Sequence, residues 1–115
     1  MAPQMAGTGH CVRVIPTTVV AGGEAEFFRL HAERHTPAVR RQPGFISKLV
    51  LQSDDDPACT LTLLTWETPE QALAWVRLPE HDQIGDGIRH LRAVGAPAGA
   101  APRGGYHVVE AVYGA

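Results

Sequence analysis

The sequence is poor in lysine, in clustered positive charge and in long apolar runs, and each shortage excludes a class of protein. Lys48 is the only lysine, and ten basic residues stand against twelve acidic ones, for a formal net charge of −2. Binding to nucleic acid phosphates needs clustered Lys and Arg, and only Arg40 and Arg41 are adjacent. We therefore expect no nucleic-acid partner.

Membrane and secretion signals are missing as well. No apolar run approaches the roughly 18 residues that a membrane-spanning helix needs, and the first ten residues lack the basic and apolar regions of a signal peptide. We expect a cytoplasmic protein with no membrane partner. The two cysteines, Cys11 and Cys59, match no metal-ligand spacing. We interpret both as buried, reduced thiols at the starts of strands.

The composition is otherwise that of one globular domain. The chain has 115 residues, of which 44% are hydrophobic and 19% charged, and these values exclude general disorder. We expect residues 1–10 to form a disordered leader and residues 11–115 to form a single domain.

Apolar periodicity predicts four strands and two helical regions. Runs rich in β-branched and apolar residues predict strands at 11–20, 45–53, 59–66 and 106–113. A helical pattern covers residues 24–41. Thr68 is a suitable N-cap, and Pro69 suits the first position of a second helix, which breaks at Pro79 before a further helical piece.

Prolines and glycines interrupt these elements. Pro16 predicts a bulge or an unpaired N–H in the first strand, and Pro37 is expected to kink or end the first helix near Thr36. Residues 95–105, rich in Gly, Pro and Ala, are expected to form a flexible loop.

Two stripes of the first helix compete for the core. One consists of Phe27, Leu30, His31, Arg34 and Ala38. The other consists of Phe28, Ala32, His35 and Val39. The second stripe is the cleaner of the two, and we expect it to face the sheet.

The order β-α-β-β-α-β predicts an α+β, ferredoxin-like fold: a four-stranded antiparallel sheet with helices on one face. The strands are apolar on both faces, as Leu61 and Leu63 against Leu64 and Trp66 show. A bare apolar sheet face would be unusually large for a monomer. We therefore expect a homodimer in which the two sheets pack together.

Histidine and serine motifs give little support for metal or hydrolytic chemistry. His31 and His35 are four residues apart on one helix, but "HAERH" is not HExxH and no third ligand has a diagnostic spacing. We interpret them as surface or pocket-lining residues and predict no metal site. Neither Ser47 nor Ser53 lies in a GxSxG motif, and no phosphate-binding glycine motif is present.

A pocket between sheet and helices is the remaining candidate site. Thr60, Thr62, Leu64 and Trp66 share one strand face by alternation. If that face lies under the helices, a cleft could suit a flat aromatic ligand. Its predicted lining residues are Phe28, His35, Trp66 and Trp75. A purely structural role of Trp66 in the core is the alternative interpretation.

Residues 41–81, "RQPGFISKLVLQSDDDPACTLTLLTWETPEQALAWVRLPEH", resemble the antibiotic-biosynthesis monooxygenase (ABM) family. The shared pattern is a PGF-type strand entry, a strand that ends in W-[ED]-[ST], an aromatic or His nine residues later, and P-x-H. The resemblance extends from about Val12 to Tyr113 and implies a dimeric α/β barrel. Within the family, the chain looks most like the cofactor-free anthrone oxygenases of aromatic polyketide pathways.

The resemblance implies that Trp66 and Arg89 line the site where a phenolic, polyketide-like substrate reacts with O₂. Trp66 would stack on the substrate, Arg89 would hold its phenolate or carbonyl, and His81 or His35 would serve as base. Further substrate-binding residues would be Phe28, Thr62, Leu64 and Trp75. No cofactor is implied, because a deprotonated anthrone can itself pass an electron to O₂.

One departure from the family pattern leaves alternatives open. The related oxygenases carry an asparagine on the first strand where this chain has Pro16. A polyketide cyclase, or another non-oxidative enzyme on the same scaffold, is therefore an alternative, and a non-enzymatic small-ligand-binding protein is another. The haem-degrading members of the family pair a first-strand asparagine with a tryptophan and a helix histidine. Here the asparagine position falls on Ile15 or Pro16 and the histidine position falls near Gly85, so the resemblance argues against haem degradation.

Overall fold

The computed structural model describes residues 6–94 and 104–114. Half of the predicted leader at 1–10 (residues 1–5) and most of the predicted loop at 95–105 (residues 95–103) lie outside the described residues. In chain order, the elements are β1 (Cys11–Thr18), α1 (Glu24–Leu30), a π-helical turn (His31–His35), α2 (Thr36–Arg40), β2 (Phe45–Ser53), β3 (Cys59–Trp66), α3 (Pro69–Val76), α4 (Pro79–Ile88), a 3₁₀ turn (Arg89–Leu91) and β4 (Tyr106–Tyr113).

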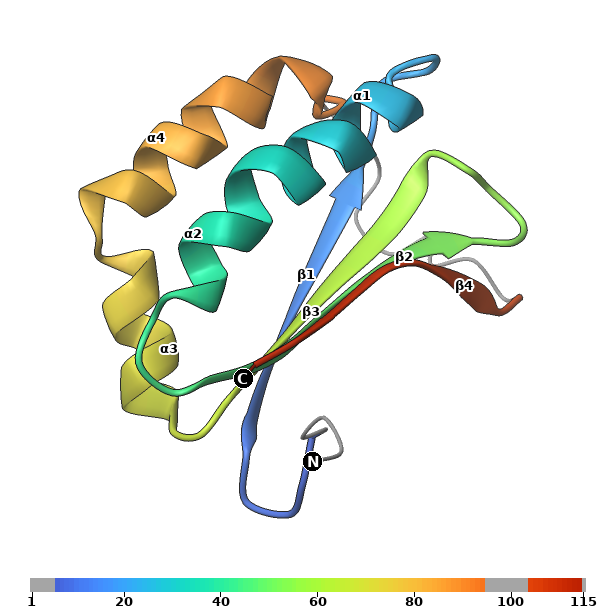
Figure 1. Ribbon diagram of the computed structural model, residues 1–115. Helices are drawn as coiled ribbons and strands as arrows, with labels where there is room; N and C mark the ends of the chain where they lie inside the picture. The colour runs from blue at the N-terminus through green and yellow to red at the C-terminus, as the bar shows by residue number, and fades with distance from the viewer. Residues whose placement is uncertain (1–5, 95–103, 115) are drawn as a thin grey trace.

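The strands form one antiparallel sheet in the order β1-β3-β2-β4. All the helices of the described residues lie on one face of this sheet. Within the same ranges no helix covers the other face, which we call the bare face (Figure 1). The predicted α+β, ferredoxin-like fold is thereby confirmed. Alternation along β3 places Thr60, Thr62, Leu64 and Trp66 under the helices, where all four are buried.

Three of the four strands have the predicted bounds, and the first is shorter than expected. β1 ends at Thr18, after which Val19 pairs with Arg92 in an isolated bridge. Pro16 causes no bulge, because the register between β1 and β3 is continuous from Cys11 to Thr18. β1 is an edge strand, a position in which a missing N–H is tolerated.

The first helical region continues from Glu24 to Arg40, so Pro37 does not end it. The departure from a regular α-helix near Thr36 is instead the π-helical turn His31–His35. Thr36 donates its backbone N–H to the carbonyl of His31, five residues earlier, which is the π-type bond. Pro37 then lies in the first turn of α2, where a proline costs the helix little.

The choice of core stripe in this helix is wrong in its first half. Phe27, His31, His35 and Val39, each four residues apart, are buried, whereas Phe28 is only partly buried. In an α-helix of 3.6 residues per turn, positions four apart drift around the axis. The wider π turn opposes this drift and keeps the four side chains on the sheet side.

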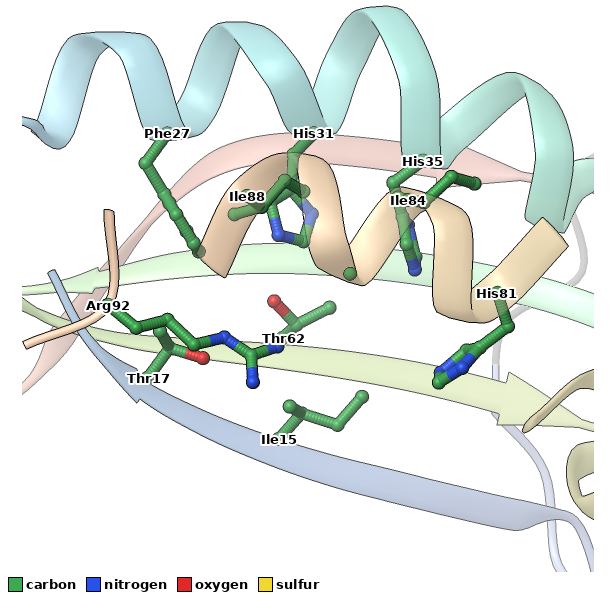
Figure 2. A pocket seen from close by; sticks show the side chains of 11 residues that line it. Ile15, Thr17, Phe27, His31, His35, Thr62, His81, Ile84, Ile88 and Arg92 are labelled. Atoms are coloured by element: carbon green, nitrogen blue, oxygen red, sulfur yellow. The ribbon is translucent and has the colours of Figure 1, made fainter. Parts of the chain in front are cut away.

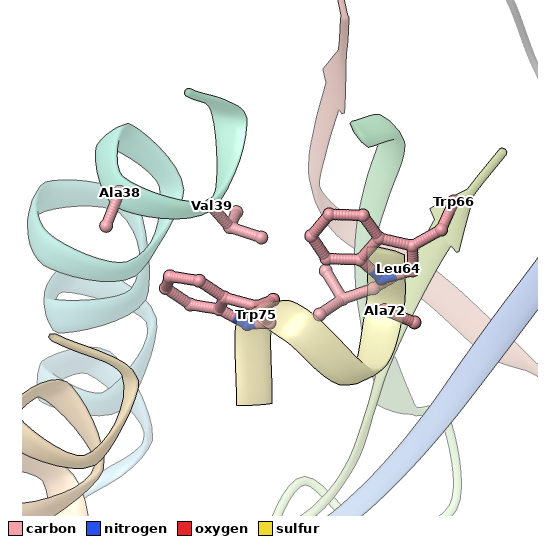
Figure 3. Packing of buried hydrophobic residues seen from close by; sticks show 6 residues of the cluster. All are labelled: Ala38, Val39, Leu64, Trp66, Ala72 and Trp75. Carbon is pink, nitrogen blue, oxygen red and sulfur yellow. The ribbon is translucent and has the colours of Figure 1, made fainter. Parts of the chain in front are cut away.

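Two hydrophobic clusters join the helices to the sheet. The larger one contains both tryptophans (Figure 3) and consists of Ala38, Val39, Leu64, Trp66, Ala72 and Trp75. The second one consists of Val19, Phe27, Leu30, Ile88 and Leu91. Cavities form where these clusters leave gaps between α4 and the sheet.

The second helical region begins as predicted. The Thr68 side chain accepts a hydrogen bond of 3.3 Å from the Gln71 N–H, and Pro69 is the first helical residue. Gly44, in the loop between α2 and β2, packs against the start of this helix: its φ is 83°, and a Cβ there would collide with Gln71. Only glycine fits that position without strain.

No helix in the two described ranges combines the length and the apolar character needed to cross a membrane.

Candidate functional site

A cavity of about 80 Å³ lies between the sheet and the helices, and we call it the main pocket (Figure 2). β1 and β3 form its floor, the π-helical turn and α4 form its walls, and most of its lining is apolar or imidazole. The lining residues are Ile15, Thr17, Phe27, His31, His35, Thr62, His81, Ile84, Gly85, Ile88 and Arg92.

Three histidines approach this pocket from two elements. His31 and His35 come from the π-helical turn, and their ring centroids are 4.9 Å apart. His81 comes from the first turn of α4. Trp75 connects the two sides, with ring centroids 5.8 Å from His35 and 5.4 Å from His81, both edge-on.

Burial keeps the two helix histidines uncharged. The pKa of His31 is lowered to about 3, first by burial and then by the positive charges of Lys48 and Arg92. The pKa of His35 is lowered well below its ordinary value, mainly by burial and then by Lys48. Within the described residues, the Nδ1 atoms of both histidines lack a hydrogen-bond partner. Both rings can therefore offer a neutral polar atom to a ligand.

His81 differs from these two because it reaches solvent. Its side chain is 35% exposed, and its Nδ1 lies 3.3 Å from Oδ1 of Asp82. Of the two bases named from the sequence, His81 is therefore the one whose ring reaches both the main pocket and solvent.

A buried ion pair lies behind the π-helical turn. Lys48 is 0% exposed, and its Nζ lies 3.1 Å from Oε1 of Glu110. The Nζ also donates to Oγ1 of Thr36 at 2.7 Å and approaches the carbonyl oxygen of His31 at 3.4 Å. Burial lowers the pKa of Lys48 to about 8, against the opposing effect of Glu110. The pair thus anchors the helical turn that carries the histidines.

The arginine that lines the main pocket is Arg92, which the sequence reasoning missed. Figure 2 shows its side chain entering the pocket beside Thr17 and Thr62. Arg89, the arginine named from the resemblance, has a side chain 76% exposed and paired with Asp86. Arg89 lines neither pocket described here, and its role in the site stays a prediction.

A smaller cavity of about 30 Å³, the side pocket, contains both tryptophans. It shares Ile15, His35 and His81 with the main pocket. Its lining residues are Arg13, Ile15, His35, Leu64, Trp66, Ala72, Trp75, Val76 and His81. Trp66 is 0% exposed, and its Nε1 has no hydrogen-bond partner within the described residues. Trp66 is thus both a core residue and a pocket wall.

Of the other predicted site residues, three line one of the two pockets and one lines neither. Thr62 lines the main pocket, and Leu64 and Trp75 line the side pocket. Phe28 lines neither of these pockets, because the π-helical turn brings Phe27 to the sheet side instead.

The first strand presents no amide to the pocket. Ile15 lines it, and Pro16 is exposed and paired with Leu61 on the bare face of the sheet. The position where related oxygenases carry asparagine is therefore apolar on the pocket side.

Part of what was missed left a signal in the sequence. Ile84, Ile88 and Arg92 are spaced by four residues, so a helical pattern continued past Ile88 would have placed Arg92 on the same side as the two isoleucines. His31 and Phe27 could not be chosen on spacing, because their orientation depends on the π turn. In the described part of the chain, no group of three or more His, Cys, Asp or Glu side chains is placed to hold a metal ion.

Comparisons with known proteins agree with this architecture. A solved structure described as "Putative antibiotic biosynthesis monooxygenase from Nitrosomonas europaea" is 19% identical, covers 96% of this chain and 95% of its own, and has a TM-score of 0.65. A conserved protein from Methanosarcina mazei Go1 is 14% identical, with 92% of each chain covered and a TM-score of 0.62. These identities show a shared fold alone. A search of curated proteins found no match.

The sequence itself supplies the stronger evidence. The family model for antibiotic biosynthesis monooxygenase, ABM, matches residues 12–86, from the first strand into the last turn of α4. Of the residues that line the two pockets, only Ile88 and Arg92 lie outside this range. Because the match covers well over half of the 115 residues, this chain belongs to the ABM family.

Proposed function

We propose that this protein is a monooxygenase that oxidises an electron-rich phenol or quinol with O₂ and needs no cofactor of its own. ABM membership supports an oxygenase, although one fold can carry many activities. The observation that carries the proposal is the pocket itself, an apolar cavity into which neutral His31 and His35, together with His81, bring imidazole groups. Such a lining suits an aromatic ring whose hydroxyl group must lose a proton.

The chemistry balances without an external reductant. His81 takes the proton of a quinol hydroxyl group, and the resulting anion passes one electron to O₂. The two radicals join through a new C–O bond to give a peroxide anion, which takes the proton back from His81 and becomes a hydroperoxide. Loss of water then breaks the O–O bond and leaves a hydroxyquinone, so that quinol and O₂ give hydroxyquinone and water. The substrate supplies all the electrons, and the protein binds, deprotonates and excludes solvent.

The size of the main pocket bears on the substrate. Its volume of about 80 Å³ is below the ~150 Å³ of a cavity known to hold benzene. A ring can enter only if a wall moves, and α4 is the weakest wall, because it contains Gly85 and Gly87 and buries little besides Ile88. A single-ring quinol needs a smaller displacement than a three-ring anthrone. We therefore place single-ring quinols first in a substrate panel, followed by anthrones.

An isotope experiment tests the proposed oxidation. The purified protein, with no cofactor added, is incubated with a quinol panel and anthrone under ¹⁸O₂, and product is analysed by mass spectrometry. We expect one ¹⁸O atom in the product and the other in water. A protein-dependent product without label would contradict the proposal.

A non-oxidative enzyme is the second candidate. It is favoured because Pro16 stands where the related oxygenases carry asparagine, and the neighbouring pocket-lining residue, Ile15, is apolar. The panel is then extended to a polyketide-type substrate and repeated under argon. Turnover without O₂ would assign the pocket to a cyclase. Ligand binding with no turnover in either gas would favour a non-enzymatic binding protein.

We also propose that two copies pack through the bare face of the sheet. Val12, Val14 and Val108 are 43%, 58% and 56% exposed on this face, and Leu61 and Leu63 are only partly buried beside them. An apolar surface of this kind is a feature of interfaces. The second copy would cover it without blocking the pockets, which lie on the helix side of the sheet (Figure 1).

A further inference from the structure

We infer that the main pocket recognises a quinol that carries a carboxylate, and that Arg92 binds this carboxylate. The inference rests on the proposed function for the ring and adds the charged group that selects it. It concerns a residue that lies outside the matched family range, residues 12–86.

The charges around the pocket favour an anion. None of the eleven lining residues is Asp or Glu, and Arg92 is the one Lys or Arg among them. Within the described residues, Arg92 forms no salt bridge, whereas Arg29, Arg41 and Arg89 all do. The nearby positive charge of Lys48 is matched by Glu110. A guanidinium at a pocket wall without an acidic partner is a ready binding group for a carboxylate.

The backbone of Arg92 is held in place, so its side chain enters the pocket from a fixed position. Val20 donates to the carbonyl of Leu91 at 2.8 Å, and Ala93 donates to the carbonyl of Thr18 at 2.8 Å. These bonds attach the residues on both sides of Arg92 to the end of β1. Val19, which pairs with Arg92, is 1% exposed. A substitution at Arg92 should therefore remove the charge without loosening the turn.

The arrangement also orients the ring. Figure 2 shows Arg92 beside Thr17 and Thr62 at one end of the pocket, and His81 at the other end. The two threonine hydroxyl groups can donate further hydrogen bonds to a carboxylate. A ring whose carboxylate lies at Arg92 presents its opposite edge, with the hydroxyl group, to His81. Binding and deprotonation then use different ends of one molecule.

Binding of two matched probes tests this inference without any turnover. The probes are 2,5-dihydroxybenzoate and 2,5-dihydroxybenzamide, which share the quinol ring and differ in charge at pH 7. Affinities are measured by calorimetry under argon for the wild type, Arg92→Gln and Arg29→Gln. Arg29 is an exposed arginine on α1, paired with Glu26 and Glu33, and it does not line the main pocket, so its substitution removes the same net charge outside the proposed anion site.

We expect the wild type and Arg29→Gln to bind the carboxylate about tenfold more tightly than the amide, the range of a partly exposed charge-assisted pair. Arg92→Gln should bind both probes with the affinity of the amide. Circular dichroism checks that its fold is kept. Equal affinities in the wild type would overturn the inference, and so would a preference that persists in Arg92→Gln. Failure of both probes to bind would overturn it too.

A fourth variant, Arg89→Gln, tests the arginine named from the resemblance. If Arg89→Gln loses the preference for the carboxylate probe and Arg92→Gln keeps it, Arg89 binds the anion and the inference is wrong. The test also separates the two proposals. A carboxylate preference without ¹⁸O incorporation leaves the anion site standing and removes the oxidation. If both probes bind with equal affinity and both are oxidised, the oxidation stands and the anion site is ruled out.

Discussion

His31 and His35 have ring centroids 4.9 Å apart on one π-helical turn, and burial lowers the pKa of each. Two uncharged imidazoles can lie this close in an apolar setting, whereas two imidazoliums would repel each other and lose their hydration. The close packing of these two rings in the main pocket therefore requires that both histidines are uncharged.

The first prediction is a loss of stability in acid. The pKa of His31 falls from 6.5 in the unfolded chain to about 3 in the folded one, so the unfolded chain binds the proton first as pH decreases. The free energy of unfolding should therefore decline between pH 6.5 and 3, by about 1.4 kcal/mol per pH unit for His31, with a further decline from His35.

Urea denaturation between pH 4 and 8 measures this slope. His31→Gln, whose side chain does not titrate, should show a shallower dependence than the wild type. An unchanged slope in His31→Gln would show that this histidine is not held neutral by the fold.

The second prediction concerns the buried pair of Lys48 and Glu110. Glu110→Gln should destabilise the fold by about 3 kcal/mol, because it leaves the ammonium of Lys48 buried without a counter-charge. Lys48→Met should cost less, since methionine fills a similar volume and the remaining carboxylate is 19% exposed and hydrated. Denaturation in urea gives both values, and the reverse order would contradict the assignment of Lys48 as the costly member.

The same lysine predicts a gain in stability in alkali. The pKa of Lys48 is about 8 in the folded protein, against 10.5 ordinarily, so the unfolded chain binds more protons between these values. Its contribution to stability should rise with pH from about 8 to 10.5. Lys48→Met should lack this rise, and a rise of equal size in that variant would assign the effect to other groups.

A further prediction identifies the base. His81→Gln should lower kcat by about 10²-fold or more, with little change in KM. His35→Gln should act mainly on KM, because a buried imidazole with a strongly lowered pKa contacts the ring without holding its proton. Steady-state kinetics on the best quinol decide, and a larger loss of kcat in His35→Gln would make His35 the base.

The last prediction concerns the bare sheet face. Val14→Asp should convert the proposed dimer into a monomer, because it places a charge within the apolar surface, beside Leu63. Val94, 100% exposed and away from the sheet, provides the control Val94→Asp. Light scattering after size-exclusion chromatography gives the molar mass. A wild type that is monomeric at all concentrations, or a dimer unaffected by Val14→Asp, would rule out this interface.

Much of the fold could be predicted because the relevant signals are local. Period-two alternation placed Thr62, Leu64 and Trp66 on one face of β3, and backbone chemistry at Thr68 and Pro69 determined where α3 begins. These signals depend on neighbours within a few residues, which the sequence displays directly.

The site was less predictable, because its geometry depends on small local irregularities and on distant contacts. With the π-helical turn in the first helical region, Phe27 and His31 line the main pocket, and Phe28, which the sequence had predicted, does not. Arg92 took the pocket position because hydrogen bonds on both sides attach its turn to the end of β1.

The sequence by itself determined most strand bounds, the start of α3, which residues of β3 share a face, and the resemblance to the family. Only the tertiary structure decided which histidines are neutral, which arginine enters the pocket and that Lys48 is buried against Glu110. The physical reason is that periodicity is a property of neighbouring residues. Desolvation and charge pairing depend on groups such as Lys48 and Glu110, which are far apart in the chain and meet only after folding.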